Sequence, residues 1–183
     1  MFNLFGSKED APANVLFVDK VYITTAGKMS ECLRKARMDP ALLFIAWFNE
    51  TVGKFREFFK ENGADAGRII EARNLYVSLL ENCVPVFVEH YPLHAKELEL
   101  AEKFQLQNVT VFSSMDEPLF KHFGSDKMIP WIKLLGMKEN ESIEHSYVTQ
   151  SIVKGQKRIA DKVLVEQSAA SQGEWMEHNL NPG

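Results

Sequence analysis

Short apolar runs alternate, over the first two thirds of the chain, with segments whose apolar residues recur at helical spacing. The runs are rich in β-branched and aromatic residues, which is typical of strands, and the segments between them have the periodicity of amphipathic helices. The predicted strands are residues 15–23, 41–48, 67–72, 84–90 and 108–114. The predicted helices between them are residues 26–38, 50–63, 74–82 and 94–104.

This alternation predicts the fold class. Strands separated by helices of this length favour right-handed crossovers, and therefore a mainly parallel sheet covered by helices on both faces. The run "ALLFIAWF" has no polar alternation, as expected of a strand buried on both sides. Asn49 is expected to cap the next helix and Gly63 to end it. The sequence thus predicts a three-layer α/β domain.

The strand pattern stops near Met115. Four helices are predicted beyond it, and the third should be about 20 residues long. They cover residues 116–124, 126–136, 145–167 and 172–180. The expected organisation is an N-terminal tail, an α/β domain and a C-terminal helical extension, which cover residues 1–14, 15–126 and 127–183.

Composition narrows the possible partners and the compartment. The chain has 183 residues, 45% of them hydrophobic, which suits one domain with an extension. Its net charge is −4 with both signs interspersed, so nucleic acid is not an expected partner. The longest apolar run is far shorter than the ~20 residues that cross a bilayer, and no leader pattern opens the chain. We therefore expect a cytoplasmic protein without membrane insertion.

The two cysteines agree with that compartment. Cys32 and Cys83 have neither the spacing nor the density of a disulfide framework. We interpret them as buried thiols in a reducing environment.

Two local patterns suggest ligand chemistry, and both are incomplete. Gly27 and Lys28 precede a helix as in a phosphate loop, but that loop requires glycine at Tyr22 and a hydroxyl at Met29. His90 and His94 have the spacing of a zinc helix, but Pro92 between them disfavours the helix and no third ligand is evident. The sequence therefore predicts no cofactor and no metal.

Other polar residues have structural explanations. Ser113 and Ser114 precede Asp116 and Glu117, the order expected where serines cap a helix and carboxylates lie in its first turn. A nucleophilic serine is disfavoured for this reason.

The long C-terminal helix carries a row of cations. Lys154, Lys157, Arg158 and Lys162 lie partly along one side of it. A solvated face is the ordinary explanation, and a docking face is the alternative.

The segment from Ser113 to Ser146 and the helix after it carry a family resemblance. The stretches "SSMDEPLFKHFGSDKM" and "LLGMKENESIEHSYVTQSIVKGQKRI" resemble SecA, the motor ATPase of bacterial preprotein translocation, where its second nucleotide-binding domain enters the helical scaffold. The shared positions are Asp116, Phe123, Gly124, Asp126, Gly136, Met137, Ile143, Glu144, His145, Val148, Thr149, Ser151, Ile152 and Gln156. A weaker similarity, which includes Glu89 and His90, extends back to Asp19.

The resemblance implies a RecA-like domain of the helicase C-terminal type, in a degenerate stand-alone form. In SecA the nucleotide lies between two such domains, and the second supplies arginines to the γ-phosphate. The printed sequence has no counterpart of the first domain, no glycine-rich segment after Asn74, and no arginine from Asn74 to Lys157. Because such arginines commonly contribute a factor of about 10³ to 10⁵ in rate, we expect no ATP hydrolysis by this chain.

Two functional hypotheses follow from the resemblance. The first is a non-catalytic interaction module that binds a protein, either SecA itself or another translocation component, through the junction between the domain and its helical extension. Its candidate residues are Asp116, Phe123, Gly124, Asp126, Glu144, His145, Thr149 and Gln156. A competing structural explanation is that the junction only packs the helical extension onto the sheet.

The second hypothesis is a half-site that completes a nucleotide site on a separate chain with a phosphate loop. It requires cations at the carboxyl edge of the sheet, where parallel sheets bind ligands. Trp47, His90 and Tyr91 are the candidate residues for a cleft at that edge.

Overall fold

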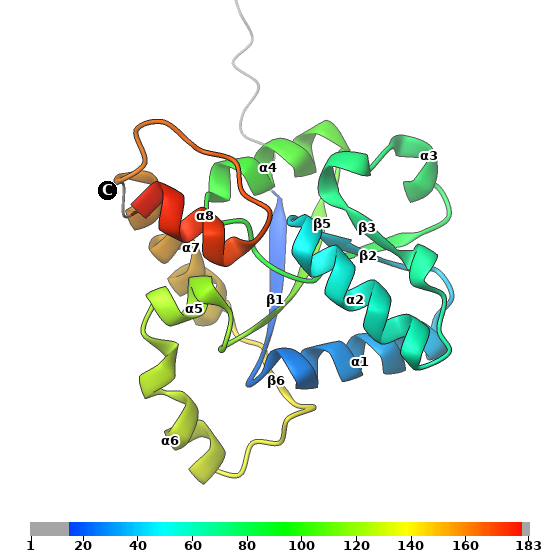
Figure 1. The fold of residues 1–183 in the computed structure, drawn as a ribbon, viewed down its shortest axis with the longest axis horizontal. Helices are drawn as coiled ribbons and strands as arrows, with labels where there is room; N and C mark the ends of the chain where they lie inside the picture. Colours follow the sequence, from blue (N-terminus) through cyan, green and yellow to red (C-terminus); the bar gives the residue numbers. More distant parts are fainter. Residues whose placement is uncertain (1–14, 181–183) are drawn as a thin grey trace, which may run out of the picture.

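The computed structural model describes residues 15–180 as a sheet with helices around it (Figure 1). The strands are β1 (Leu16–Tyr22), β2 (Leu42–Ala46), β3 (Ile69–Glu71), β4 (Val84–Phe87), β5 (Asn108–Ser114) and β6 (Ser142–Ile143). The helices are α1 (Thr25–Met38), α2 (Asn49–Glu61), α3 (Val77–Leu80), α4 (His94–Lys103), α5 (Pro118–His122), α6 (Ile129–Leu134), α7 (Ser146–Ala160) and α8 (Gln172–Leu180). Short 3₁₀ turns are η1 (Ala66–Arg68), η2 (Ala72–Asn74) and η3 (Ser125–Lys127).

The sheet has the order β3-β2-β4-β5-β1-β6. The first five strands are parallel, and β1 pairs with β5 along its whole length, from Leu16 opposite Asn108 to Tyr22 opposite Ser114. The last strand is antiparallel and pairs Ile143 with Val21 at the free edge of β1. The prediction of no strand after Met115 is therefore wrong, because two residues are too few to show a periodicity.

The two faces of the sheet bury separate apolar clusters. Side chains alternate along β2, so Phe44 packs with α1 and α2 while Leu43 and Ile45 pack with residues of α3 and α4. The first face is filled by aromatic and aliphatic side chains such as Phe55 and Phe59, which are fully buried. This arrangement confirms the predicted three-layer α/β fold.

The C-terminal helices form a third apolar cluster with the end of β1. Val21, Phe48 and Met115 pack there with side chains of α5, α7 and α8, and Trp175 of α8 is fully buried. The helices from α5 onward therefore share a core with the sheet rather than standing apart from it. Figure 1 shows α5, α7 and α8 grouped beside β1.

Several predicted element bounds are wrong. The helix predicted over residues 145–167 ends at Ala160, after which the chain turns back and α8 packs Trp175 into the core. The helix predicted over residues 74–82 is reduced to the four residues of α3. Asn49 is the first residue of α2, whose N-cap is Phe48. Gly63 does follow this helix with a φ of 68°, a conformation that suits glycine.

Two further sequence predictions concern cysteines and membranes. Cys32 is fully buried in the core, where desolvation raises the pKa of its thiol to about 12, and Cys83 is half-buried. Within residues 15–180, no helix combines the length and the apolar character that a membrane span requires.

Gly27 in α1 permits close approach of the loop before β6. A Cβ atom at Gly27 would lie 2.1 Å from the carbonyl oxygen of Glu139, whereas a Cβ at Gly53 in α2 would meet nothing within 4 Å. We predict that Gly27→Ala lowers the free energy of unfolding by about 1–3 kcal/mol, because the loop must move. The matched Gly53→Ala should raise it by about 0.5–1 kcal/mol through helix propensity. Urea titrations of both variants test this; equal effects of the same sign would contradict the close approach.

Candidate functional site

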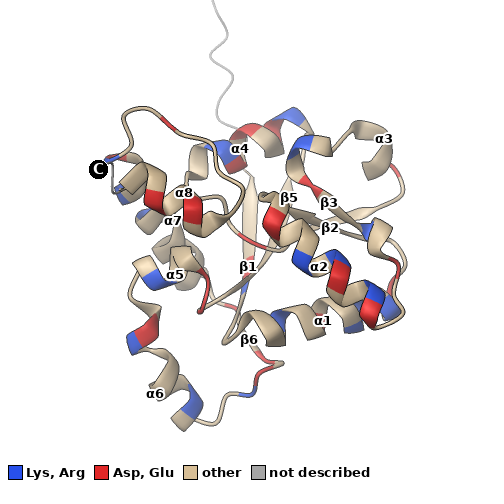
Figure 2. Cartoon of the chain, viewed as in Figure 1, with Lys and Arg blue, Asp and Glu red and all other residues tan. Residues whose placement is uncertain are grey.

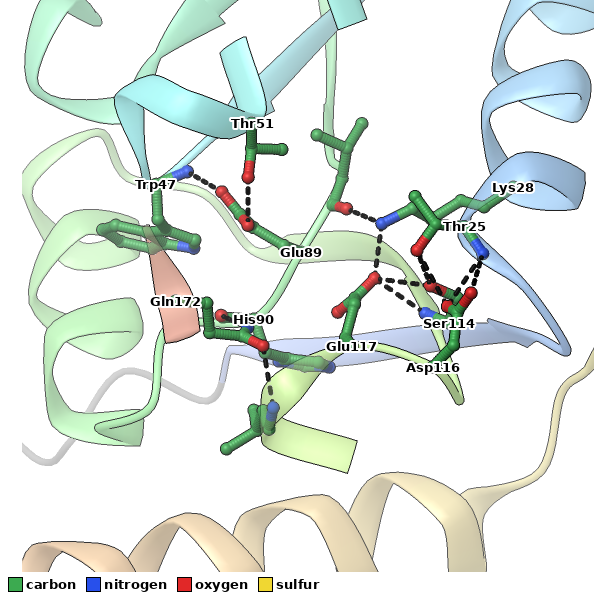
Figure 3. A network of polar contacts seen from close by, with 12 residues as sticks. Thr25, Lys28, Trp47, Thr51, Glu89, His90, Ser114, Asp116, Glu117 and Gln172 are labelled. Atoms are coloured by element: carbon green, nitrogen blue, oxygen red, sulfur yellow. Dashed lines mark hydrogen bonds and ion pairs between the residues drawn. The ribbon is translucent and has the colours of Figure 1, made fainter. Parts of the chain in front are cut away.

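The carboxyl ends of β1, β2, β4 and β5 meet at one edge of the sheet, where buried polar side chains such as Glu89, His90 and Glu117 lie in the loops that follow the strands (Figure 3). Because β2 and β4 are neighbours that send their helices to opposite faces, a crevice is expected between them. This edge is therefore the first candidate site. Its polar groups form three connected clusters, which we describe in turn.

A buried histidine lies between two carboxylates. His90 follows β4, and its Nε2 lies 2.8 Å from Asp19 Oδ1 of β1, while its Nδ1 lies 2.8 Å from Glu97 Oε1 of α4. All three side chains are almost inaccessible to solvent. Burial alone would lower the pKa of His90, but Glu97 and Asp19 raise it to about 10. Burial would raise the pKa of Glu97, but His90 holds it at about 2. The cluster is therefore a carboxylate–imidazolium–carboxylate triad.

Two glutamines connect this triad to the C-terminal helices. Gln156 of α7 donates its side-chain N–H groups to Tyr91 O at 2.7 Å and to Glu97 Oε2 at 2.9 Å. Gln172 of α8 donates to His90 O at 3.0 Å and accepts from the backbone N–H of Leu119 at 2.8 Å. Both glutamines are buried. Since both ring nitrogens of His90 contact carboxylates, this histidine has a structural environment rather than one open to a ligand.

The second cluster is built around the carboxylate of Glu89 at the start of α2. Glu89 accepts the backbone N–H groups of Trp47 and Phe48 at 2.9 and 3.0 Å and the hydroxyl of Thr51 at 2.7 Å. Its burial raises its pKa to about 7, although the Thr51 hydrogen bond opposes the shift. The free N–H groups at the start of α2, where an anionic ligand could bind, are thus used by a side chain of this chain.

The third cluster lies at the N-terminus of α1, where a carboxylate binds the first helical residue. Asp116 accepts the backbone N–H of Thr25 at 2.8 and 3.0 Å and its hydroxyl at 2.8 Å. Lys28, which is buried, forms an ion pair with Glu117 and donates to Val88 O. A phosphate at this helix terminus would have to displace the Asp116 carboxylate. The second residue of the Gly27–Lys28 pair is therefore committed to an internal ion pair.

This geometry corrects the predicted serine caps. The N-cap of α5 is Glu117, and Ser114 donates its backbone N–H and hydroxyl to Glu117 Oε1 at 2.8 and 3.0 Å. Ser113 is fully buried in β5. Asp116 stabilises α1 rather than the helix that follows it in sequence. Sequence spacing could not reveal this because Thr25 and Asp116 are distant along the chain.

Trp47 and Tyr91 fill much of the remaining edge with aromatic rings. Trp47 stacks on Phe87 at a centroid distance of 5.6 Å and contacts Tyr91 at 5.2 Å, and Tyr91 stacks on Phe48 at 5.6 Å. Two cavities lie at this edge, and only one of them is lined by these rings. One, of about 260 Å³, is lined by Glu89, Asp116 and Glu117 among others. The other, of about 460 Å³, is lined by Trp47, Tyr91 and pairs of opposite charge. His90 lines neither.

The junction residues do not converge on one point. Phe123 lies over Gly155 of α7, where a Cβ atom would be 2.4 Å from its ring, and Gly124 has a φ of 86° at the turn into η3. Glu144 pairs with Lys20 at 2.9 Å. His145 caps α7 by accepting the N–H of Tyr147 at 3.2 Å.

The remaining junction candidates are dispersed. Asp126 is exposed, Thr149 is half-buried, and Asp116 and Gln156 lie in the polar clusters described above.

Helix α6, within the junction segment, was not a sequence candidate. Its Trp131 and Leu134, and Leu135 at its end, expose 69%, 78% and 86% of their surface. They occupy positions i, i+3 and i+4, so they share one face of the helix. We call this surface the α6 face. The spacing of these three residues can be seen in the sequence. It does not distinguish an apolar helix face that is buried from one that is exposed.

Side chains that could bind a metal ion together are also lacking among the described residues. Among residues 15–180, no group of three histidine, cysteine, aspartate or glutamate side chains is arranged to hold a metal ion.

Comparison with known proteins finds homology to SecA over about 50 residues. The SecA of Acidithiobacillus ferrooxidans is 43% identical over 51 residues, which are 28% of this chain and 6% of that protein. The SecA proteins of Endomicrobium trichonymphae and Methylococcus capsulatus are each 42% identical over 48 residues, which are 26% of this chain and 6% and 5% of theirs. No family model matches. The chain thus corresponds to a small fraction of the length of the translocase subunits that it matches.

The buried triad predicts a specific pH dependence. The folded-state pKa of His90, about 10, exceeds its ordinary value of 6.5, so its stabilising contribution is complete below pH 6.5 and is lost as pH rises toward 10. We predict that His90→Gln lowers the free energy of unfolding by about 3–5 kcal/mol near pH 6.5, because two buried carboxylates lose their shared cation. Urea titrations from pH 6 to 10 should show the difference shrinking with rising pH.

The control for this experiment is His178→Gln in α8. His178 is about 40% exposed and lies 4.0 Å from Glu174, so its replacement should change stability by less than ~0.5 kcal/mol. A constant difference between wild type and His90→Gln over this pH range would show that His90 is not charged in the folded state.

Proposed function

We propose that this chain is a non-catalytic, SecA-like interaction module of RecA-like fold that acts in protein translocation by binding a protein partner. The observation that carries the proposal is the exposed α6 face, which presents three large apolar side chains within the segment that resembles SecA. Contiguous exposed apolar surface of this kind marks interaction sites in soluble proteins. Trp131 is of a residue type that is enriched among interface hot spots.

The charged side chains at the carboxyl edge of the sheet support the proposal that the chain is not catalytic. Phosphoryl transfer needs cations that neutralise the developing charge on the phosphate, and arginine is best suited because of its planar fork of donors. The cavity at the start of α1 and α2 is instead lined by Glu89, Asp116 and Glu117, and Lys28 is already paired. The other lysine in its lining, Lys54, is paired with Glu50, so neither lysine of this cavity is left free for a phosphate.

Charge distribution supports a protein partner over a nucleic acid. Figure 2 shows acidic and basic residues interspersed on α2 and α4. The net charge of the chain is −4. Binding to a phosphate backbone depends on a concentrated basic surface, so this pattern disfavours it.

The homology to SecA supports a translocation partner. About 50 residues of the chain resemble the translocase subunit at 37–43% identity. We propose SecA itself, or another component of the translocation machinery, as the protein that covers the α6 face.

The alternative function is the half-site for nucleotide on a separate chain. The cavity of about 460 Å³ favours it, because Arg73, Lys96 and Lys103 line it next to the ring of Trp47. Two of these cations are offset by acids, since Arg73 lies 2.9 Å from Glu71 and Lys96 lies 3.3 Å from Glu99. The local charge is therefore nearly balanced, which makes this site weaker for a polyphosphate than the α6 face is for a protein.

Direct binding to purified SecA tests the proposal. We predict measurable binding by biolayer interferometry, and at least a tenfold loss of affinity, equivalent to about 1.4 kcal/mol, in Trp131→Ser/Leu135→Ser. Both side chains are mostly exposed, so the variant should fold. Tyr76→Ser, which removes a residue that is 56% exposed near α3, is the matched control and should bind as the wild type does.

Calorimetric titration with MgATP separates the two functions. The interaction module should give no heat of binding when MgATP is titrated into this chain alone. With SecA present, the heat should equal the heat that SecA gives by itself. Tight magnesium-dependent binding that Lys96→Ala/Lys103→Ala removes would favour the half-site. Absence of SecA binding by the wild type would contradict SecA as the partner, and release of inorganic phosphate well above background would contradict the non-catalytic assignment.

A further inference from the structure

A cavity of about 640 Å³ lies between α5, β6 and α7. Its walls are mainly apolar, with Phe120 and Phe123 from the α5 region, Ile143 from β6, and Val148 and Ile152 from α7. Pockets that hold small organic ligands have volumes of about 300–1,000 Å³ and mostly apolar walls. The cavity is separate from the carboxyl-edge clusters, and the α6 face does not line it.

One end of this cavity is cationic. The α7 residues that line it run from Tyr147 to Arg158, a rise of roughly 16 Å along the helix. Lys162, which follows the end of α7, also lines it, together with His122. Burial and the nearby charge of Lys162 both lower the pKa of His122. The cavity therefore changes along α7 from an apolar end to an end with two permanent positive charges.

These charges lack internal partners. Neither Arg158 nor Lys162 forms an ion pair with any residue between 15 and 180, and none of the lining residues is acidic. Arg158 lies in the last turn of α7, where a cation stabilises the helix dipole, but Lys162 lies beyond the helix end and has no such role. In a chain of net charge −4, an apolar cavity with two unpaired cations at one end is complementary to an amphipathic anion.

We propose that this cavity binds a single-chain carboxylate, with its alkyl chain between α5 and α7 and its carboxylate beside Arg158 and Lys162. The apolar walls would remove the chain from water, and the guanidinium of Arg158 can form two parallel hydrogen bonds with a carboxylate. The glycine at position 155 contributes to the shape of the cavity, because the ring of Phe123 occupies the space of its missing side chain. This ligand site does not depend on the protein partner proposed above.

Isothermal titration of the full chain with monomeric dodecanoate, below its critical micelle concentration, tests the proposal. Octanoate, decanoate and dodecanoate should bind progressively more tightly, by up to about fourfold per added methylene. Dodecanol has the same chain without the charge and should bind at least tenfold more weakly than dodecanoate.

Variants test which end of the cavity binds the carboxylate and which part binds the alkyl chain. Arg158→Gln/Lys162→Gln should weaken dodecanoate binding about tenfold or more and leave dodecanol binding unchanged. Lys154→Gln/Lys157→Gln removes the same charge from exposed positions of α7 that do not line the cavity, and should bind as the wild type does. Ser151→Phe, at an exposed position that lines the cavity, should weaken both ligands by filling it.

Three results would overturn the proposal. The first is affinity independent of chain length, and the second is an equal loss in the two charge variants, which would indicate non-specific attraction. The third is loss of dodecanoate binding in Leu135→Ser, which would place the ligand on the α6 face. Failure of SecA binding would leave all these measurements unaffected, so this proposal and the proposed function can fail separately.

Discussion

Three ionisable side chains in the interior, Asp19, His90 and Glu97, hold together parts of the chain that are distant in sequence. They come from β1, from the loop after β4 and from α4, and Gln156 adds α7 through its hydrogen bond to Glu97. Burial of such charges is costly unless each has a partner, and here each imidazole nitrogen faces a carboxylate. The triad therefore links α7 to the sheet, in addition to the apolar cluster that packs α5, α7 and α8 against the end of β1.

Pairing of buried charges also determines which groups occupy the helix N-termini at the carboxyl edge. Helix N-termini attract anions, and in parallel α/β sheets they commonly hold phosphates. In this chain Asp116 occupies the start of α1 and Glu89 occupies the start of α2. Both helix starts are therefore occupied by carboxylates of the same chain. Two other surfaces lack internal partners. The α6 face exposes apolar side chains to water, and Arg158 and Lys162 form no ion pair with any of the described residues.

The short homology to SecA is consistent with this division. The match covers 51 residues, whereas a site assembled from distant parts of a chain needs more than one segment. Packing and docking features are more local. Phe123 over Gly155 and His145 at the start of α7 are held by residues within one segment.

The sequence by itself determined the alternation of the first five strands with helices and the three-layer α/β class, because apolar periodicity is a local property that each of these elements carries. It also excluded a complete phosphate loop at Gly27 and Lys28. Only the tertiary structure decided that α7 ends at Ala160, that Asp116 caps α1 instead of α5, and that His90 is shared by two carboxylates. Those outcomes depend on contacts between residues far apart in sequence, such as Thr25 with Asp116, whose geometry exists only once the sheet has brought its carboxyl ends together.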